Sequence, residues 1–317
     1  MRVVTADGID DALTFPVLID ALDEAFRADL VAPARHHHEI EGPGAAGTLL
    51  LMPAWTGAAA GAARFMGVKI VSVFPDNGAQ GLSSVLGTYV LMDGATGAPL
   101  AALDGTRLTL WRTAAASALA ARHLARRDAS RMAMIGAGAL APFLIRAHLS
   151  QRPIGQVTLW NHRPDKARAL AAALSREGLP VEATTDLEAA VRGADLVSCA
   201  TMSTTPLVRG AWLRPGAHLD LVGAFNLAMR EADDEALQRA RLYVDTPAAK
   251  VEGGDVAVAL RSGALDESAV KGDLFGLCRG DAPGRGTPDE ITLFKSVGSA
   301  IEDLAAATAV WRASDSR

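Results

Sequence analysis

The sequence predicts an α/β protein in which an N-terminal α+β domain precedes a Rossmann-type, doubly wound parallel sheet. Three observations predict this class. Residues 131–245 alternate between short apolar strands and helices, which is typical of a parallel sheet covered on both faces. One of these strands runs directly into a glycine-rich turn. The segments between residues 48 and 103 are short, rich in β-branched or aromatic residues, and separated by turn residues.

The first domain is predicted to begin with a helix and to continue as a sheet. Pro16 lies near the helix start, and apolar residues recur at helical spacing to Phe26. Four segments then indicate an antiparallel or mixed sheet: 48–53, 62–74, 84–92 and 98–103. The alanine-rich run from Arg107 to Ala125 contains no helix breaker, so it predicts a long helix that can pack closely against a neighbour.

The second domain is predicted from five apolar strand segments with helices between them. These segments are RMAMIG, QVTLW, ADLVSCAT, AHLDLVG and RLYVD. The stretch from Asp289 to Trp311 predicts one further long helix. We therefore expect a first domain over residues 1–120, a second over residues 121–298, and a C-terminal helix over residues 299–317 that returns to the first domain.

Composition and charge exclude several classes of protein. The 317 residues are 50% hydrophobic and 21% charged, which provides enough apolar surface for a globular fold and excludes a disordered chain. A net charge of −5 and a pI near 5.8 argue against a nucleic-acid partner, which requires a basic face. No apolar run approaches the length of a membrane span. The two cysteines and the absence of a signal-peptide pattern at the start predict a cytoplasmic protein.

The glycine turn is the strongest local indication of a ligand. Strand RMAMI leads into a GxGxxA turn that runs from Gly136 to Ala141 and opens a helix. Gly136 permits the tight turn, Gly138 lets the backbone approach a pyrophosphate, and a small residue at 141 lets the helix pack closely on the strand. The following strand QVTLW ends at the spacing expected of a dinucleotide site, so a purely structural turn is the weaker interpretation.

The end of the second strand indicates which dinucleotide is bound. A site for NAD usually carries an acid there, whereas this chain has Asn161, His162 and Arg163, with Lys166 following. Cations favour the 2′-phosphate of NADPH and a carboxylate would repel it. We therefore predict NADPH, with NADH as the alternative cofactor. The competing interpretation is a solvated loop that is basic by chance.

Cations inside apolar segments indicate a second site. Lys69 lies within the strand MGVKIVSVF, and Arg112 lies within the apolar helix segment LTLWRTAAASALAA. Each is more often structural when taken alone. Together with Arg35 they form a set that can clamp an anionic substrate such as a carboxylate. The run His36-His37-His38 predicts an exposed loop and no metal site, because adjacent strand residues point to opposite faces and no matching ligand cluster is evident.

Taken together, these segments resemble the ornithine cyclodeaminase/μ-crystallin family over nearly the whole chain. RTAAASALAA and FKSVG are the most specific matches, and LLLMPAW, GVKIVSVFPDN, GLSSV, IGAGALA, ADLVSCAT and LRPGAHLDLVGA occur in the family's order. The resemblance implies a substrate-binding and dimerisation domain before a dinucleotide-binding domain, and therefore a homodimer. The first-domain sheet also has no second βα layer to cover it, which favours a dimer independently.

The resemblance also assigns residues to roles. It implies that Arg35, Lys69 and Arg112 bind a carboxylate and that Ser84 lies near the substrate, with Lys69 as the candidate catalytic residue. The cofactor-binding residues that we expect, beyond those named above, are Ala139, Leu140, Thr201 and Val297. The glutamine that is usual within the family's glycine turn is replaced here by Ala139 and Leu140, which leaves the pyrophosphate contacts to the backbone.

One departure from the family pattern decides the expected reaction. Phe225 occupies the place where cyclodeaminases carry an aspartate, and phenylalanine cannot exchange a proton. The ending MREADDE resembles the ketimine reductase branch. We therefore expect reduction of small cyclic imino acids: Δ1-pyrroline-2-carboxylate to L-proline and, as a second substrate, Δ1-piperideine-2-carboxylate to L-pipecolate. The alternatives are an alanine or amino-acid dehydrogenase of the same fold, an ornithine cyclodeaminase, and a noncatalytic NADPH-dependent binding protein.

Overall fold

The computed structural model describes residues 1–42, 46–58 and 64–315. The chain divides into two compact units. The first unit contains Met1–Arg112 and Ser299–Arg317, and the second contains Thr113–Gly298. Helix α3 (Gly105–Leu124) begins in the first unit and continues into the second.

The first unit is built on a mixed sheet of seven strands. Six of them run in the order β1-β7-β6-β5-β4-β2, and β3 also pairs with β4. All pairings are antiparallel except that of β1 with β7. The strands are β1 (Arg2–Val4), β2 (Leu30–Val31), β3 (His36–Ile40), β4 (Gly47–Thr56), β5 (Phe65–Val73), β6 (Val85–Asp93) and β7 (Pro99–Asp104). A short 3₁₀ helix, η1 (Pro75–Gln80), follows β5. Strand β5 is therefore an interior strand of this sheet.

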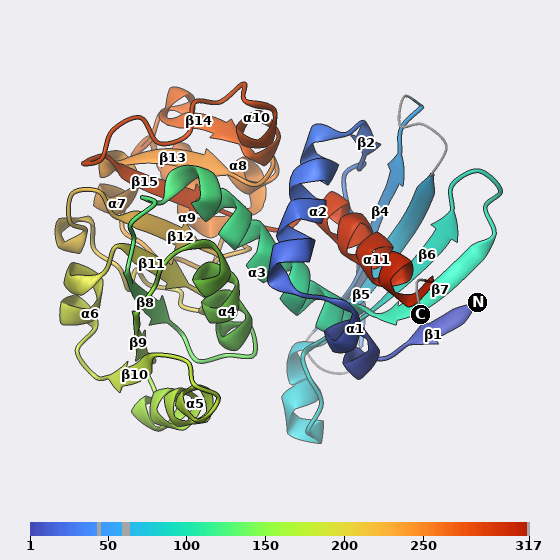
Figure 1. The fold of residues 1–317 in the computed structure, drawn as a ribbon, viewed down its shortest axis with the longest axis horizontal. Coiled ribbons are helices and arrows are strands. Elements are labelled where there is room, and N and C mark those ends of the chain that lie inside the picture. The colour runs from blue at the N-terminus through green and yellow to red at the C-terminus, as the bar shows by residue number, and fades with distance from the viewer. Residues whose placement is uncertain (43–45, 59–63, 316–317) are drawn as a thin grey trace. The chain divides into compact units, whose positions relative to one another are not determined.

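Helices cover one face of this sheet. They are α1 (Ala6–Ala12), α2 (Phe15–Arg27) and α11 (Ala300–Asp315), and Figure 1 shows α11 lying beside α2 and over the strands. Along α2 the residues at helical spacing are buried, among them Leu18, Leu22 and Phe26. The sheet supplies a matching row, in which Met52, Lys69 and Tyr89 lie opposite one another on β4, β5 and β6 and are all buried.

The other face of the sheet carries exposed apolar side chains. Paired residues on neighbouring strands point to the same face, and successive residues alternate between the faces. Ile70 therefore points away from the row that contains Lys69, and Trp55 and Leu86 share its face through their pairing with Met66 and Ser72. Trp55, Ile70 and Leu86 are 40%, 38% and 40% exposed.

The second unit is a parallel sheet of eight strands in the order β10-β9-β8-β11-β12-β15-β13-β14. Every pairing is parallel. The strands are β8 (Arg131–Ile135), β9 (Gln156–Trp160), β10 (Val181–Thr184), β11 (Leu196–Cys199), β12 (His218–Leu221), β13 (Ala240–Val244), β14 (Val270–Asp273) and β15 (Ile291–Lys295). The chain runs outward from β8 to β10 on one side and restarts at β11 on the other. The carboxyl ends of β8 and β11 therefore form the topological switch point, where ligands bind in such sheets.

Helices connect these strands and bury them. They are α4 (Ala141–Gln151), α5 (Pro164–Arg176), α6 (Leu187–Gly193), α7 (Asp234–Arg239), α8 (Ala249–Glu252), α9 (Gly254–Ser262) and α10 (Leu274–Arg279), with the 3₁₀ turns η2 (Gly210–Trp212) and η3 (Glu267–Ala269). The central strands β11, β12 and β15 are buried at every position. The predicted class, a Rossmann-type parallel sheet with an α+β domain, is confirmed.

Two local predictions are wrong. The stretch from Asp289 to Trp311 is not one helix: Ile291–Lys295 forms the interior strand β15, and α11 begins only at Ala300. His36–His38 is not a loop but the start of β3, and all five residues of this strand are exposed. Residues 62–63 of one predicted strand and residues 316–317 of the predicted last helix lie outside the described residues.

Within the described part of the chain, none of the helices combines the length and apolar character needed to cross a membrane.

Candidate functional site

Lys69 lies where a charged side chain cannot reach water. It is the fifth residue of β5, it pairs with Met52 on one side and Tyr89 on the other, and it is only 2% exposed. A lysine on an edge strand could extend its ammonium group into solvent, but β5 has a neighbour on each side. The ammonium group therefore needs partners inside the protein.

Two acids at the start of α11 supply these partners. The Lys69 ammonium lies 2.9 Å from Asp303 Oδ1 and 2.8 Å from Oδ2. Arg112, which is 6% exposed, places Nε 3.0 Å from Asp303 Oδ1 and Nη1 2.8 Å from Glu302 Oε2. Asp303 thus bridges the two cations. We call Lys69, Arg112, Glu302 and Asp303 the cation–acid cluster, and its formal charges sum to zero.

The cluster alters the acidity of its lysine. Burial, together with the nearby Arg112 guanidinium, lowers the pKa of Lys69 to about 8, although Asp303 and Glu302 oppose the fall. Like charges and desolvation disfavour the ammonium form. The Lys69 proton is consequently exchangeable near neutral pH, which is a property of groups that bind or relay protons at functional sites.

The other two predicted substrate residues occupy different places in the first unit. Arg35 is half-buried and directly precedes β3, in which His36 pairs with Leu51. Ser84 precedes β6, and its backbone oxygen accepts a bond from Phe74 N. Phe74 is five residues beyond Lys69, roughly 17 Å along an extended strand. The structure therefore brings Lys69 and Arg112 together but does not place Ser84 beside them.

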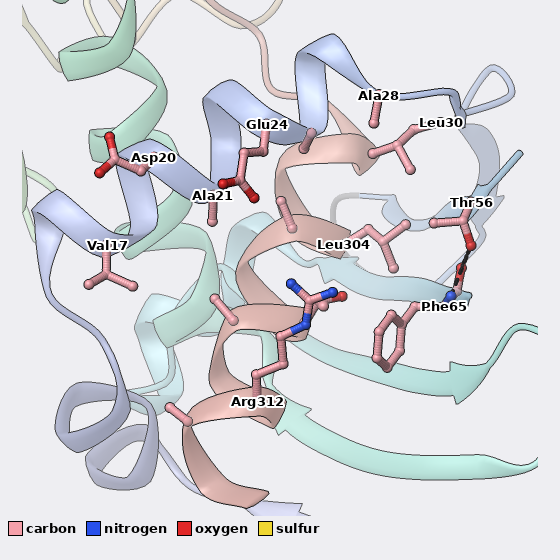
Figure 2. A pocket seen from close by; sticks show the side chains of 15 residues that line it. Val17, Asp20, Ala21, Glu24, Ala28, Leu30, Thr56, Phe65, Leu304 and Arg312 are labelled. Carbon is pink, nitrogen blue, oxygen red and sulfur yellow. Dashed lines mark hydrogen bonds between the residues drawn. The ribbon is translucent and has the colours of Figure 1, made fainter. Parts of the chain in front are cut away.

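A hollow of about 630 Å³ opens between α2 and α11 in the same unit. Figure 2 shows Glu24 of α2 and Arg312 of α11 directed toward it from opposite sides. The Arg312 guanidinium carbon lies 5.7 Å from the centre of the Phe65 ring. Neither Lys69 nor Arg112 is among the residues that line this hollow, so it is distinct from the cation–acid cluster.

In the second unit, the glycine turn follows β8 at the switch point. Gly136 has φ of +108°, a conformation that side chains disfavour, and a Cβ there would lie 2.5 Å from Ala200 O. Around Gly138 nothing in the described structure lies within 4 Å of the place of a Cβ. The turn therefore leaves open backbone at the start of α4, which is the arrangement that a pyrophosphate requires.

A cavity of about 500 Å³ lies beside this turn. Its walls come from the segments that follow β8, β9 and β11. The lining residues that the sequence predicted are Gly136, Gly138, Asn161, His162, Lys166 and Thr201. Ala139, Leu140, Arg163 and Val297 do not line it.

Asn161 has a role that the sequence did not reveal. Its side-chain oxygen accepts a bond from Ala137 N at 3.3 Å, and its amide donates to Arg163 O at 3.1 Å. Asn161 therefore connects the glycine turn to the loop after β9, and its amide is already engaged. His162, Arg163 and Lys166 are exposed, which leaves the cations of this loop open to an anionic ligand.

Val297 follows β15 and is fixed through its backbone. Val297 N and Gly298 N donate to Asp245 Oδ2 at 2.7 and 2.6 Å. Phe225 follows β12 and is 49% exposed. The cavity and its loops fit a dinucleotide by their open glycine turn and by the cations after β9.

Sequence reasoning missed the buried acids. Glu302 and Asp303 in the first unit, and Glu231 and Asp255 in the second, are each 0% exposed. The available signal was the same as for Lys69: an ionisable residue inside an apolar segment, such as SAIEDLAAATA. That signal marks a buried charge but does not identify its partner.

Comparisons with known proteins agree with this description. The model of the ornithine cyclodeaminase/mu-crystallin family matches residues 2–316. A Δ1-pyrroline-2-carboxylate reductase of Colwellia psychrerythraea is 34% identical over 316 residues, which is 98% of each chain.

Two solved structures share the whole fold. The Thermococcus litoralis Δ1-pyrroline-2-carboxylate reductase, in complex with NADH and L-proline, has a TM-score of 0.92 at 31% identity and covers 100% of this chain and 98% of its own. An archaeal alanine dehydrogenase dimer with bound NAD has a TM-score of 0.91 at 30% identity and covers 100% of this chain and 96% of its own.

Proposed function

The chain belongs to the ornithine cyclodeaminase/mu-crystallin family, and on this premise we propose that it reduces Δ1-pyrroline-2-carboxylate to L-proline with NADPH. The observation that carries the proposal is the buried pair Lys69 and Arg112, in a chain that also has a dinucleotide-type cavity. When bound, the nicotinamide supplies a hydride to the imine carbon, and the imine nitrogen takes one proton.

The cation–acid cluster favours a substrate that is itself neutral overall. Lys69 and Arg112 already face Asp303 and Glu302, so a bare carboxylate would add an uncompensated negative charge to a buried site. A cyclic imino acid with a protonated nitrogen carries one charge of each sign. Its carboxylate suits the two cations and its iminium suits the acids. Protonation also makes the imine carbon electrophilic, so positioning supplies most of the catalysis.

The segment after β12 argues against ammonia loss from ornithine. Phe225 offers no general base where cyclodeaminases carry aspartate, and its exposed ring cannot exchange a proton. We therefore place the chain with the reductases and extend the proposal to Δ1-piperideine-2-carboxylate, whose carboxylate and iminium are arranged as in the smaller ring.

An open-chain amino-acid dehydrogenase is the second candidate, because the archaeal alanine dehydrogenase shares the fold. A noncatalytic binding protein is the third, and the buried cations argue against it. One assay separates them: NADPH oxidation with cyclic imines, with 2-oxo acids plus ammonia, and NAD reduction with L-ornithine. Reduction of the preformed cyclic imine without ammonia is the expected result. Strict ammonia dependence, turnover of ornithine, or NADPH binding without turnover would each replace the proposal with a named alternative.

Arg163→Ala is expected to weaken the use of NADPH and to leave that of NADH nearly unchanged. Arg163 lies in the exposed loop after β9, where a guanidinium can bond to the 2′-phosphate. Loss of such a charge-assisted bond costs about 1–3 kcal/mol in kcat/KM. Steady-state kinetics with both cofactors measure the effect. Lys166→Ala is the variant for comparison, because it removes a cation that lines the cavity. Equal losses of kcat/KM for both cofactors would show that Arg163 stabilises the loop and does not bind the 2′-phosphate.

We expect the protein to form a dimer through the exposed face of the first-unit sheet, which carries Trp55, Ile70 and Leu86. Light scattering at micromolar concentration should give at least twice the chain mass of 32.9 kDa. Ile70→Lys places a charge on this face and should shift the protein toward the monomer. Val251→Lys is the control, because Val251 is 60% exposed on α8 of the other unit. A monomeric wild type would contradict the prediction.

A further inference from the structure

Glu231 is a buried acid whose carboxylate is surrounded by hydrogen-bond donors. It is 0% exposed. Its Oε1 accepts bonds from Thr201 N at 2.7 Å and Thr201 Oγ at 2.8 Å. Its Oε2 accepts bonds from Gly223 N at 2.7 Å and Ala224 N at 3.3 Å. All four groups donate, so the pattern suits an ionised carboxylate, which only accepts.

The donors belong to the segments that follow two neighbouring parallel strands. Thr201 follows β11 and lines the cavity, whereas Gly223 and Ala224 follow β12. The residue before Thr201 packs against the glycine turn, because a Cβ on Gly136 would lie 2.5 Å from Ala200 O. One carboxylate thus fixes the cavity wall that faces the glycine turn.

We propose that Glu231 is a positioning residue for the dinucleotide, whose ionised carboxylate holds Thr201 and the segment 223–224 in the conformation that binds the cofactor. This inference rests on the proposed function of the cavity. A protonated carboxyl, or the amide of glutamine, places a donor against the backbone N–H groups. The cavity wall then loses bonds on one side, and cofactor affinity falls.

The surroundings of Glu231 set the pH at which it loses its charge. Asp255 of α9 accepts bonds from Glu231 N at 2.8 Å and Ala232 N at 3.0 Å. Lys295 of β15 lies 3.3 Å from Asp255 Oδ2, and Arg230 Nε lies 3.9 Å from Asp255 Oδ1. On the β11 side is Cys199, whose thiol has a pKa raised well above its usual value by burial, so it stays neutral.

Burial is the main cause that raises the pKa of the Glu231 carboxyl to about 7. Lys295 and the bonds from Thr201 oppose this rise, and Asp255 adds to it. Because binding requires the anion, affinity for the cofactor falls as the pH falls through 7.

The experiment is a fluorescence titration of NADPH between pH 6 and pH 8 with wild type, Glu231→Gln and Glu231→Asp. Wild type should bind up to about tenfold more weakly at pH 6 than at pH 8, which is the limit for one proton linked to a group with a pKa of about 7. Glu231→Gln should bind at least about tenfold more weakly at pH 8. Glu231→Asp retains the charge and should recover part of the affinity and the pH dependence.

Matched controls isolate this residue. The 2′-phosphate of NADPH also titrates in this range, but it is the same ligand for both proteins, so the difference between wild type and Glu231→Gln isolates Glu231. Glu235→Gln makes the same change at an exposed position of α7 and should bind NADPH as wild type does. At saturating NADPH, Glu231→Gln should keep a kcat close to that of wild type, because the defect lies in affinity.

A wild-type affinity that does not change between pH 6 and pH 8 would overturn the inference, even if Glu231→Gln fails to fold. Equal affinities and equal pH slopes for wild type and Glu231→Gln would overturn it as well. Absence of NADPH binding by wild type at any pH would overturn the proposed function instead.

Discussion

Replacing Lys69 or Arg112 with methionine is expected to lower kcat/KM for Δ1-pyrroline-2-carboxylate about 30- to 4,000-fold. Losing one charged partner of a buried ion pair costs roughly 2–5 kcal/mol. Methionine keeps most of the side-chain volume and removes the charge. The loss of kcat/KM therefore measures how much the charge contributes to binding the substrate carboxylate. Cofactor affinity should hardly move, because the glycine turn and the cavity are formed by other residues.

Two measurements localise this defect. NADPH binding by fluorescence should match that of wild type in both variants, which also shows that the second unit is folded. Wild-type kcat/KM should fall as the pH rises through about 8, where Lys69 loses its proton, and Lys69→Met should lack this decline. If Lys69→Met keeps full activity, the lysine only neutralises Asp303, and the substrate site must be rebuilt around Arg35 and Arg112.

Asp303→Asn is expected to destabilise the first unit by about 3–5 kcal/mol, the usual cost of breaking a buried ion pair by removing one partner. Asp303 bonds to both Lys69 and Arg112, so the substitution leaves two buried cations with one carboxylate between them. Hydrogen exchange of peptides from β5 and α11 measures the stability of this unit directly. Asp165→Asn, at a position with a 93% exposed side chain in a surface ion pair, is the control and should have little effect.

A double-mutant cycle tests whether the ion pair between Lys69 and Asp303 is responsible for this loss of stability. Lys69→Met combined with Asp303→Asn should be less destabilising than the sum of the two single variants by about 0.5–3 kcal/mol. Strictly additive effects would mean that Lys69 and Asp303 are stabilised independently and that the cluster does not act as a unit.

The sequence was informative where the signal is local. The glycine turn, the strands beside it and the alternation over residues 131–245 depend on neighbouring residues, and the predicted parallel sheet is confirmed. Lys69 and Arg112 stood out because each is a charge within an apolar run. Their acid partners could not be predicted, because Asp303 is 234 residues from Lys69 in the sequence and no local pattern reports such a distance.

The two wrong elements have physical explanations. Ile291–Lys295 is buried at every position between β12 and β13, so its sequence does not alternate strictly between apolar and polar residues. Periodicity cannot distinguish such a short buried segment from part of a buried helix. His36–Ile40 forms a strand because it pairs with β4, although its exposed polar side chains are typical of a loop. In both cases pairing with distant strands determines the structure.

The first unit consists of two parts that are far apart in the sequence, which affects how the protein folds during its synthesis on the ribosome. The sheet, with Lys69 and Arg112, is synthesised before the whole of Thr113–Gly298, and α11 comes after it. At ~5–20 residues per second, the nascent sheet spends on the order of ten seconds or more without α11, one of its three covering helices, and without Glu302 and Asp303. The first unit is therefore completed only after the whole of Thr113–Gly298 has been synthesised. A nascent chain stalled before Ser299 presents a sheet face that α11 does not yet cover and lacks Glu302 and Asp303, which bind Lys69 and Arg112. Exposed apolar surface of this kind makes a partly folded chain prone to aggregation.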